Sequence, residues 1–124
     1  MARNGKSKTD IKTYIENKYG YDLERTWEYL NRTYSWDSSC QGTVPEAIIA
    51  FLESEDFEDA IRKAVSMGGD SDTLACITGG IAEAYYKTIP GNIATPVWNN
   101  LPESLREIVK EVSEKTPYGS VFSI

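Results

Sequence analysis

A segment rich in small residues, Asp72 to Tyr86, places the strongest constraint on the fold of this 124-residue chain. Alanine and glycine recur along it together with one cysteine, so neighbouring backbones can approach it closely. Gly79 and Gly80 each cost about 1 kcal/mol relative to alanine inside a helix, and close packing must offset that cost. We therefore expect a central, fully buried helix over 72–86 with other helices packed around it.

Apolar residues recur at helical spacing on both sides of this segment, and residues that typically cap or stop helices separate the runs. The alternating pattern typical of strands is absent from the sequence. Length and composition are those of one globular domain, so we expect a compact all-α domain over residues 1–124. The expected starts and stops are Ser7 to Asp10 and Gly20 for a first helix, Asp22 for a second, Thr43 to Glu46 for a third, Asp56 with Gly68 and Gly69 for a fourth, and Glu103 to Val112 for a last, preceded by a looser region punctuated by Pro90, Gly91, Pro96 and Pro102.

Paired glycines and then Asp-Ser-Asp-Thr at 70–73 lead directly into the small-residue helix. One residue is enough to cap a helix, so the repeated oxygen ligands in one tight loop favour a hard divalent cation such as Mg²⁺. The alternative is that Asp70 or Asp72 only caps the helix and meets the positive end of its dipole. An EF-hand is excluded, because Leu74 and Ile81 occupy its fifth and twelfth positions counted from Asp70.

Composition narrows the classes of function. With 19 acidic and 13 basic residues the formal charge is -6, which leaves no basic footprint for nucleic acid. Histidine is absent, so chemistry must depend on carboxylates, hydroxyls, backbone groups or a hard metal ion. No apolar run is long enough for a signal peptide or a membrane span, and the two cysteines favour a reducing cytoplasm. Cys76 is expected to be a packed, small apolar side chain.

The run CQGTVPEAIIAFLESEDFEDAIRKAVSMGGDSDTLACITGGIAEAYY, from Cys40 to Tyr86, closely resembles the C-terminal half of the ADP-ribosylglycohydrolase family. Weaker similarity extends from about Gly5 through the last helix, and the GGDSDT loop before a small-residue helix is its specific part. The resemblance implies an orthogonal all-α fold with a binuclear Mg²⁺ centre that hydrolyses the glycosidic bond between ADP-ribose and a protein side chain. The expected partner is an ADP-ribosylated protein or ADP-ribose.

By position, the resemblance implies that Asp70, Asp72 and Thr73 are metal ligands. The two carboxylates are also expected to be catalytic, since one of them can accept a proton from a water that the cations position. Residues of the 38–43 loop occupy a family position near the substrate pocket. The expected substrate contacts are Ser39, Gln41, Gly42 and Gly69.

Simpler interpretations of the 34–43 region stay open on its residues alone. The loop can be a polar connection in which Thr43 only caps the next helix. Tyr34 and Trp36 either stack on an adenine or cover the core.

The resemblance leaves half of the family's ligand set without a counterpart, because the hydroxyl and acids of its N-terminal half have no match before Gly5. Asp37, Glu16, Asp22 and Glu24 are acids nearby in sequence, and nothing identifies them as substitutes. Three functions stay open. The chain is a hydrolase completed by an N-terminal half or a second copy, a truncated non-catalytic module that dimerises, or a protein that binds ADP-ribose or a nucleotide without cleaving it.

Overall fold

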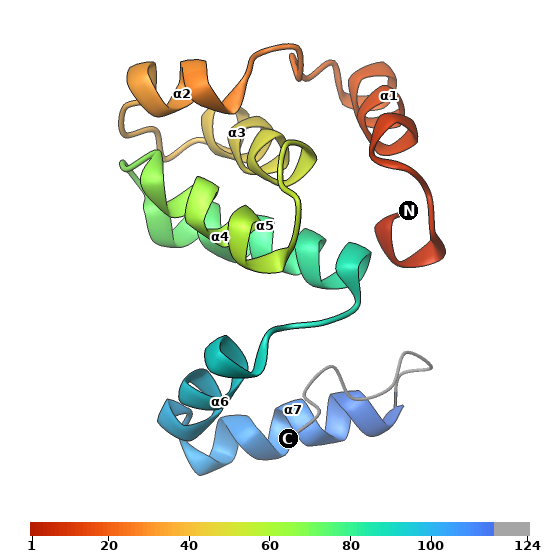
Figure 1. Cartoon of the computed structure of the whole chain (residues 1–124), viewed down its shortest axis with the longest axis vertical. Helices are drawn as coiled ribbons and strands as arrows, with labels where there is room; N and C mark the ends of the chain where they lie inside the picture. The colour runs from red at the N-terminus through yellow and green to blue at the C-terminus, as the bar shows by residue number, and fades with distance from the viewer. Residues whose placement is uncertain (116–124) are drawn as a thin grey trace. The chain divides into compact units, whose positions relative to one another are not determined.

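The computed structural model describes residues 1–115, which form seven α-helices and one short 3-10 helix without a strand (Figure 1). This confirms the all-α class. The chain groups into two compact units, Met1–Tyr86 and the residues from Lys87 onward, and the single domain over 1–124 stays a prediction, with 116–124 outside the described residues. The elements are η1 (Ala2–Asn4), α1 (Lys8–Tyr19), α2 (Trp27–Thr33), α3 (Cys40–Leu52), α4 (Phe57–Ser66), α5 (Ser71–Tyr86), α6 (Gly91–Asn100) and α7 (Glu103–Lys115).

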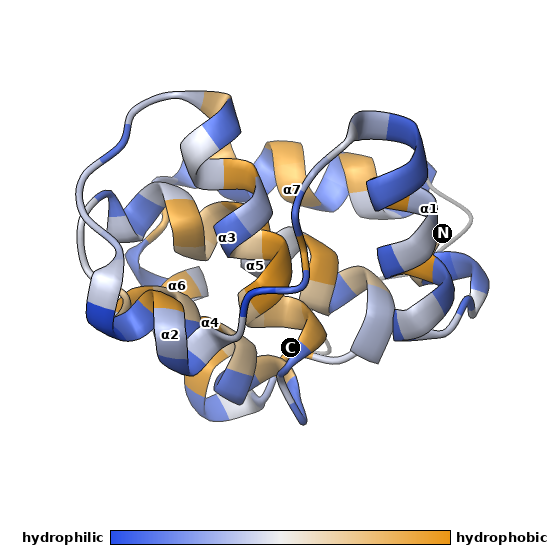
Figure 2. Ribbon diagram, turned by 90° about the horizontal axis from the view of Figure 1, so that it is seen from above, coloured by the Kyte–Doolittle hydropathy of each residue, from blue (hydrophilic) through white to orange (hydrophobic). Residues whose placement is uncertain are grey.

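The core of the first unit is built on α3 and α5, on which hydrophobic residues are concentrated (Figure 2). On α3, every residue from Pro45 to Phe51 is buried, which suits a helix that has neighbours on several sides. Across the contact with α5, the buried Thr78 hydroxyl donates a hydrogen bond to the carbonyl of Ala47 at 2.9 Å. The two helices therefore pack directly, and the buried Thr78 hydroxyl is satisfied by this bond.

The central helix α5 is buried on one side only, so the prediction of a fully buried helix is wrong. Its buried residues are Leu74, Thr78 and Ala82, which recur every fourth position and form a single stripe. The opposite stripe, which includes Asp72, Thr73, Cys76 and Gly80, is exposed.

Close packing explains one of the two neighbouring glycines of α5 and not the other. A Cβ at Gly79 would stand 3.0 Å from the Cδ1 atom of Ile61, so the close approach of α4 accounts for that glycine. A Cβ at Gly80 would meet nothing within 4 Å. Cys76 is an exposed free thiol and not a packed side chain, contrary to expectation.

Helix caps confirm the predicted limits of α1 and α4. Ser7 and Asp10 form a capping box at the start of α1, and Gly20 ends it in the left-handed conformation at φ 70°. The side chain of Asp56 accepts a hydrogen bond from the backbone of Asp59 and caps α4. These capping signals act on residues close in sequence, so the sequence alone predicted these helix limits correctly.

Two predicted helix starts are wrong because another residue takes the cap. Asp22 accepts the N–H of Glu24 in a local turn, and Thr26 caps α2 instead. Ser39 caps α3 one turn before the predicted Thr-x-x-Glu box, while the Thr43 hydroxyl donates to the carbonyl of Asp37.

The looser region predicted before the last helix contains a helix, α6, that the prolines concealed. Pro90 precedes it and its carbonyl accepts the N–H groups of Ile93 and Ala94, so this proline sits where its missing donor costs nothing. Pro96 lies inside α6 at the cost of one helix hydrogen bond. The predicted last helix is confirmed as α7 and runs one turn further than expected, to Lys115.

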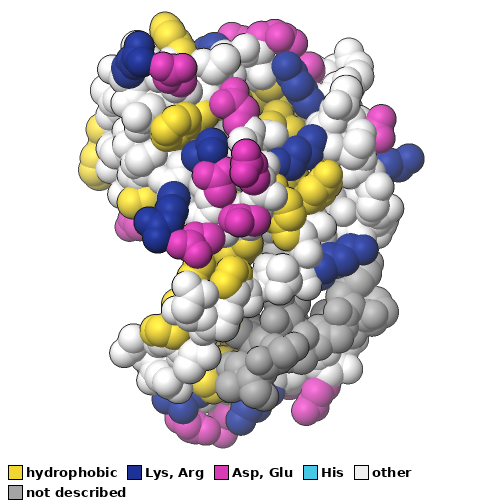
Figure 3. Space-filling view, viewed as in Figure 1, with side chains coloured by type: hydrophobic (Ala, Val, Ile, Leu, Met, Phe, Trp, Pro, Cys, Tyr) yellow, Lys and Arg dark blue, Asp and Glu magenta, His cyan; other side chains and the backbone are white. Residues whose placement is uncertain are grey.

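Acidic and basic side chains are interspersed on the face of the first unit that Figure 3 shows. Several form ion pairs one turn apart, such as Glu58 with Arg62 at 2.6 Å and Asp59 with Lys63 at 2.7 Å on α4. Among residues 1–115, no helix is both long enough and apolar enough to cross a membrane.

Lys8 ties α1 to the core of the first unit. Its Nζ atom donates to the Tyr86 hydroxyl at 2.9 Å and lies 5.0 Å from the ring centroid of Phe51 and 5.7 Å from that of Tyr85. A half-buried ammonium with three aromatic neighbours on α3 and α5 attaches α1 to these helices more firmly than an exposed ion pair can.

We expect Lys8→Met to lower the free energy of unfolding by about 1–2 kcal/mol, because it removes a charged hydrogen bond and the ring contacts. Urea denaturation measures the change. Lys18→Met is the control, since the Lys18 ammonium lies over Tyr14 and Tyr19, both of which are exposed. Equal losses in the two variants would contradict the role given to Lys8.

Candidate functional site

The acidic loop forms the N-terminus of α5. Gly68 and Gly69 both take positive φ, 74° and 61°, and turn the chain from α4 into the loop. The carbonyl of Asp70 accepts the N–H of Leu74 at 3.0 Å, which makes Asp70 the N-cap residue of α5 through its backbone. The carboxylates of the loop therefore lie beside the N–H groups of the first turn of α5, and the Thr73 N–H donates to the Asp72 Oδ1 atom at 3.0 Å.

The carboxyl groups of Asp70 and Asp72 lie near each other at the start of α5. A hydrogen bond with the Asp70 side chain lowers the pKa of Asp72, and the backbone N–H groups of Thr73 and of Asp72 itself lower it further. Two carboxylates so close repel each other unless a proton or a cation lies between them. Asp72 and Thr73 are exposed and Asp70 is half-buried, so solvent reaches the pair.

A third acid is not brought to this pair. Within residues 1–115, no group of three or more His, Cys, Asp or Glu side chains could hold a metal ion. Asp22 pairs with Arg25 at 3.5 Å and Glu24 with Lys12 at 2.9 Å, so these acids are engaged elsewhere. The two carboxylates and one hydroxyl of the predicted ligand set are fewer than the six ligands that Mg²⁺ takes.

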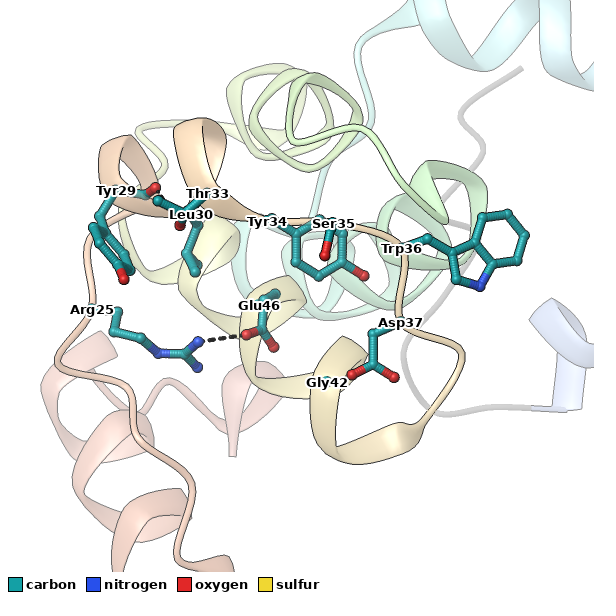
Figure 4. Close-up of a pocket in the computed structure, with 10 residues that line it drawn as sticks. All are labelled: Arg25, Tyr29, Leu30, Thr33, Tyr34, Ser35, Trp36, Asp37, Gly42 and Glu46. Carbon is teal, nitrogen blue, oxygen red and sulfur yellow. Dashed lines mark hydrogen bonds and ion pairs between the residues drawn. The ribbon is translucent and has the colours of Figure 1, made fainter.

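Gly69 lies directly against the segment that precedes α3. A Cβ at Gly69 would stand 2.7 Å from the Cε1 atom of Tyr34 and 3.4 Å from the Cα atom of Trp36. Close packing therefore explains this glycine, and its contact with substrate stays a prediction. The Tyr34 ring covers the loop, whereas the Trp36 side chain is 70% exposed and points away from the other residues drawn in Figure 4.

Asp37 holds the start of α3 through hydrogen bonds with Ser39 and Thr43. The sequence analysis named Asp37 only as a nearby acid and predicted no contact for it. The Asp37 carboxylate accepts the N–H of Ser39 at 2.7 Å, and this hydrogen bonding with Ser39 lowers the pKa of Asp37. A Cβ at Gly42 would stand 1.9 Å from the Asp37 Oδ2 atom, so a larger residue there would displace the Asp37 side chain. Ser39 caps the helix by accepting the Gly42 N–H, and Gln41 is exposed. The 34–37 segment thus joins the two loops that were predicted separately.

A pocket of about 320 Å³ lies between α2, the 34–37 segment and the first half of α3 (Figure 4). Arg25 and Glu46 meet in it, with Arg25 Nη1 2.6 Å from Glu46 Oε1. The Glu46 side chain is only 6% exposed, and its other oxygen, Oε2, has no hydrogen-bond partner. The sequence analysis used Glu46 only as part of a capping box, although a glutamate directly before the apolar run of α3 was a signal of a buried charge.

The environment of Tyr34 links this pocket to the acidic loop. Burial raises the pKa of the Tyr34 hydroxyl above its ordinary value of 10.0, and the hydroxyl of Thr43 opposes that shift. The negative charges of Glu46, Asp37 and Asp70 raise the pKa further. The neutral form of Tyr34 is therefore favoured by folding.

A group whose pKa is raised by folding contributes stability that is fully present below its unfolded pKa and is lost as the pH rises through the folded pKa. We therefore expect the wild-type protein to lose stability above about pH 10, and Tyr34→Phe to lose less over the same interval. Urea midpoints at pH 9 and pH 11 test this. Tyr19→Phe, at an exposed position, should behave as the wild type, and equal losses in all three proteins would refute the assignment.

Comparison with known proteins adds to this geometry. The family model described as ADP-ribosylglycohydrolase matches residues 5–119. A protein of Acanthamoeba polyphaga mimivirus, named as a candidate ADP-ribosyl glycohydrolase, L543, is 42% identical over 82 residues, which cover 61% of this chain and 24% of the relative. An uncharacterised protein of Archaeoglobus fulgidus is 36% identical over 67 residues, which cover 54% of this chain and 22% of the relative.

The chain spans about a quarter of the length of these curated relatives. No solved structure matches it. Because the family match extends over nearly the whole chain, this protein belongs to the ADP-ribosylglycohydrolase family.

Proposed function

We propose that this chain is an ADP-ribosylglycohydrolase-like domain that contributes one side of an Mg²⁺ site for hydrolysing the bond between ADP-ribose and a protein side chain. The observation that supports it is the position of two carboxylates, Asp70 and Asp72, within three residues at the solvent-accessible N-terminus of α5. Membership of the family supports the same chemistry. The free thiols of both cysteines support a reducing compartment such as the cytoplasm.

The residues of the loop fit part of such a site. Carboxylate and hydroxyl oxygens are the ligands that Mg²⁺ prefers, so Asp70, Asp72 and Thr73 would hold it. When bound, Mg²⁺ supplies a Lewis acid that polarises an oxygen and lowers the pKa of a bound water. One carboxylate of the pair would accept the proton of the attacking water. The remaining ligands, including those of a second Mg²⁺, come from an N-terminal half or from a second copy of the chain.

The proposed substrate contacts are Ser39, Gln41, Gly42 and Gly69. Ser39 caps α3 and Gln41 and Gly42 lie in its first turn, and a helix N-terminus favours anionic groups such as a diphosphate. Tyr34 against Gly69 and Asp37 against Gly42 connect this turn to the acidic loop. One ligand could therefore span the two loops.

Release of ADP-ribose from a mono-ADP-ribosylated protein, measured with and without Mg²⁺, tests the proposal. The chain is assayed alone and with an N-terminal half of a longer family member. Activity should require Mg²⁺ and fall at least about a hundredfold in Asp70→Asn, since a ligand and a catalytic carboxylate are lost together. Glu53→Gln, an exposed carboxylate at the end of α3, is the matched control and should keep full activity. Failure of the added half to produce any release would count against a hydrolase.

The absence of a third acid beside the pair, among residues 1–115, favours a second candidate function. The chain would then be a non-catalytic module that dimerises or that binds ADP-ribose or a nucleotide without cleaving it. Calorimetry with millimolar ADP-ribose and Mg²⁺ tests for binding, and sedimentation tests for the dimer. A monomer that gives no heat would exclude this candidate.

A further inference from the structure

Glu46 carries a buried charge that the fold satisfies only in part. One of its carboxylate oxygens accepts a hydrogen bond from Arg25. The other oxygen has no hydrogen-bond partner, although the side chain is only 6% exposed. A buried polar atom without a partner costs about 1–3 kcal/mol, and more when it is charged. Glu46 lines a pocket, so a hydrogen-bond donor that reached this buried, unpaired oxygen from the pocket would bind favourably.

The rest of the pocket suits a cation better than a neutral donor. Its charged lining residues are two acids, Glu46 and Asp37, and one base, Arg25, whose charge Glu46 already shares. The tyrosine rings of positions 29 and 34 also line it, and the faces of aromatic rings attract cations. Tyr29 is 55% exposed, so its ring stands where a ligand can approach from solvent.

The size of the pocket limits what it can hold. About 320 Å³ lies near the lower end of the range of roughly 300–1,000 Å³ for small-molecule sites. It suits a cationic group on a short aliphatic stem and not a nucleotide.

We propose that this pocket binds a small organic cation, an ammonium or guanidinium group on a short aliphatic chain, with Glu46 Oε2 as its main hydrogen-bond acceptor. The cation would donate to the unpaired oxygen of Glu46 while Arg25 keeps the other oxygen. Tyr29 and Tyr34 would contact the cation or its stem. This binding does not depend on whether the Asp70 loop is catalytic.

Titration of the ¹⁵N-labelled protein with n-butylguanidinium and with n-butylammonium chloride, at constant ionic strength, tests the proposal by NMR. We expect saturable shifts at the backbone amides of the pocket residues, while amides of α7 stay unchanged. Neutral n-butylurea, which has nearly the shape of n-butylguanidinium, should give no saturable shift. Saturation by either cation supports the site, whereas equal binding of n-butylurea would overturn it.

Variants distinguish the contribution of the Glu46 carboxylate to binding from that of the tyrosine rings. Glu46→Gln should weaken binding at least about tenfold, because it removes a charged acceptor. Glu53→Gln carries the same change at an exposed position and should bind as the wild type. Unchanged affinity in a folded Glu46→Gln would overturn the proposal.

A second variant keeps the test decisive if Glu46→Gln fails to fold. Tyr29→Leu alters an exposed ring and should weaken binding about two- to fivefold. Tyr19→Leu, at a position that is 58% exposed and away from the pocket, is its control. Equal affinities in these two variants would also overturn the site.

Discussion

Replacement of Arg25 by methionine is expected to lower the free energy of unfolding by about 3 kcal/mol, because it leaves the charge of Glu46 buried and unpaired. The Glu46 carboxylate is 6% exposed and Arg25 is its only hydrogen-bond donor among the described residues. Removal of one partner of a buried pair typically costs about 3–5 kcal/mol. The lower end of that range applies here, since Arg25 itself is 31% exposed and water can partly screen the site.

Arg32→Met is the matched control, because Arg32 pairs with Glu28 at 2.5 Å on the same stretch of chain and both side chains are about 70% exposed. An exposed pair one turn apart contributes only about 0.3–0.5 kcal/mol. Urea denaturation of both variants at pH 7 gives the comparison. Losses of similar size would show that the Arg25 pair is no more important to stability than a surface pair.

A double variant distinguishes an unpaired charge from lost packing. Arg25→Met with Glu46→Met removes both charges, and well-packed apolar replacements of a buried pair are often neutral or stabilising. The double variant should therefore recover most of the stability that Arg25→Met loses. A double variant as unstable as Arg25→Met would show that the loss of stability comes from lost packing and not from an unpaired charge.

Local signals in the sequence predicted the fold well where one residue acts on its near neighbours. Ser7, Gly20 and Asp56 each bond the backbone within four residues, and the helices that they limit were predicted correctly. The cap of α3 was predicted at Thr43 and is Ser39 instead, because the Thr43 hydroxyl donates to the Asp37 carbonyl, a contact that spacing does not show.

The prediction of α5 failed on one side for a related reason. Small residues allow close packing but do not require it, so the pattern could not distinguish Gly79, which Ile61 approaches, from Gly80, which has open space beside it. Helix α6 was concealed in the same way, since Pro96 is unfavourable inside a helix and yet lies within one. In both cases contacts beyond the immediate neighbours decide the outcome.

Most of the candidate site was visible in the sequence only as separate pieces. The acidic loop is one contiguous motif, so its carboxylates could be identified directly. The pocket joins Arg25 and Glu46, which are 21 residues apart, through the packing of the segment before α2 against α3. Tyr34 joins the pocket to the loop through its contact with Gly69. The spacing of residues in the sequence does not predict contacts between distant segments, so this part of the site is seen only in the structure.

Leu74→Ala is expected to lower the free energy of unfolding by about 3 kcal/mol, through lost burial and a cavity that the core fills only in part. Leu74 is fully buried, with 0% exposure, and comes one residue after Thr73, so it fixes the end of α5 that carries the acids to the core. Its loss should therefore also increase hydrogen exchange at the start of α5 more than at the start of α3.

Leu105→Ala makes the same chemical change at a position that is 46% exposed on α7, and it should cost less than about 0.5 kcal/mol. Thermal and urea unfolding of both variants measure the difference. A small loss in Leu74→Ala would mean that the core around α5 can collapse around a missing side chain, and the acids would then not depend on Leu74 for their position. A large loss with faster exchange confined to the first turns of α5 would instead connect the packing of the core to the geometry of the Asp70 and Asp72 carboxylates.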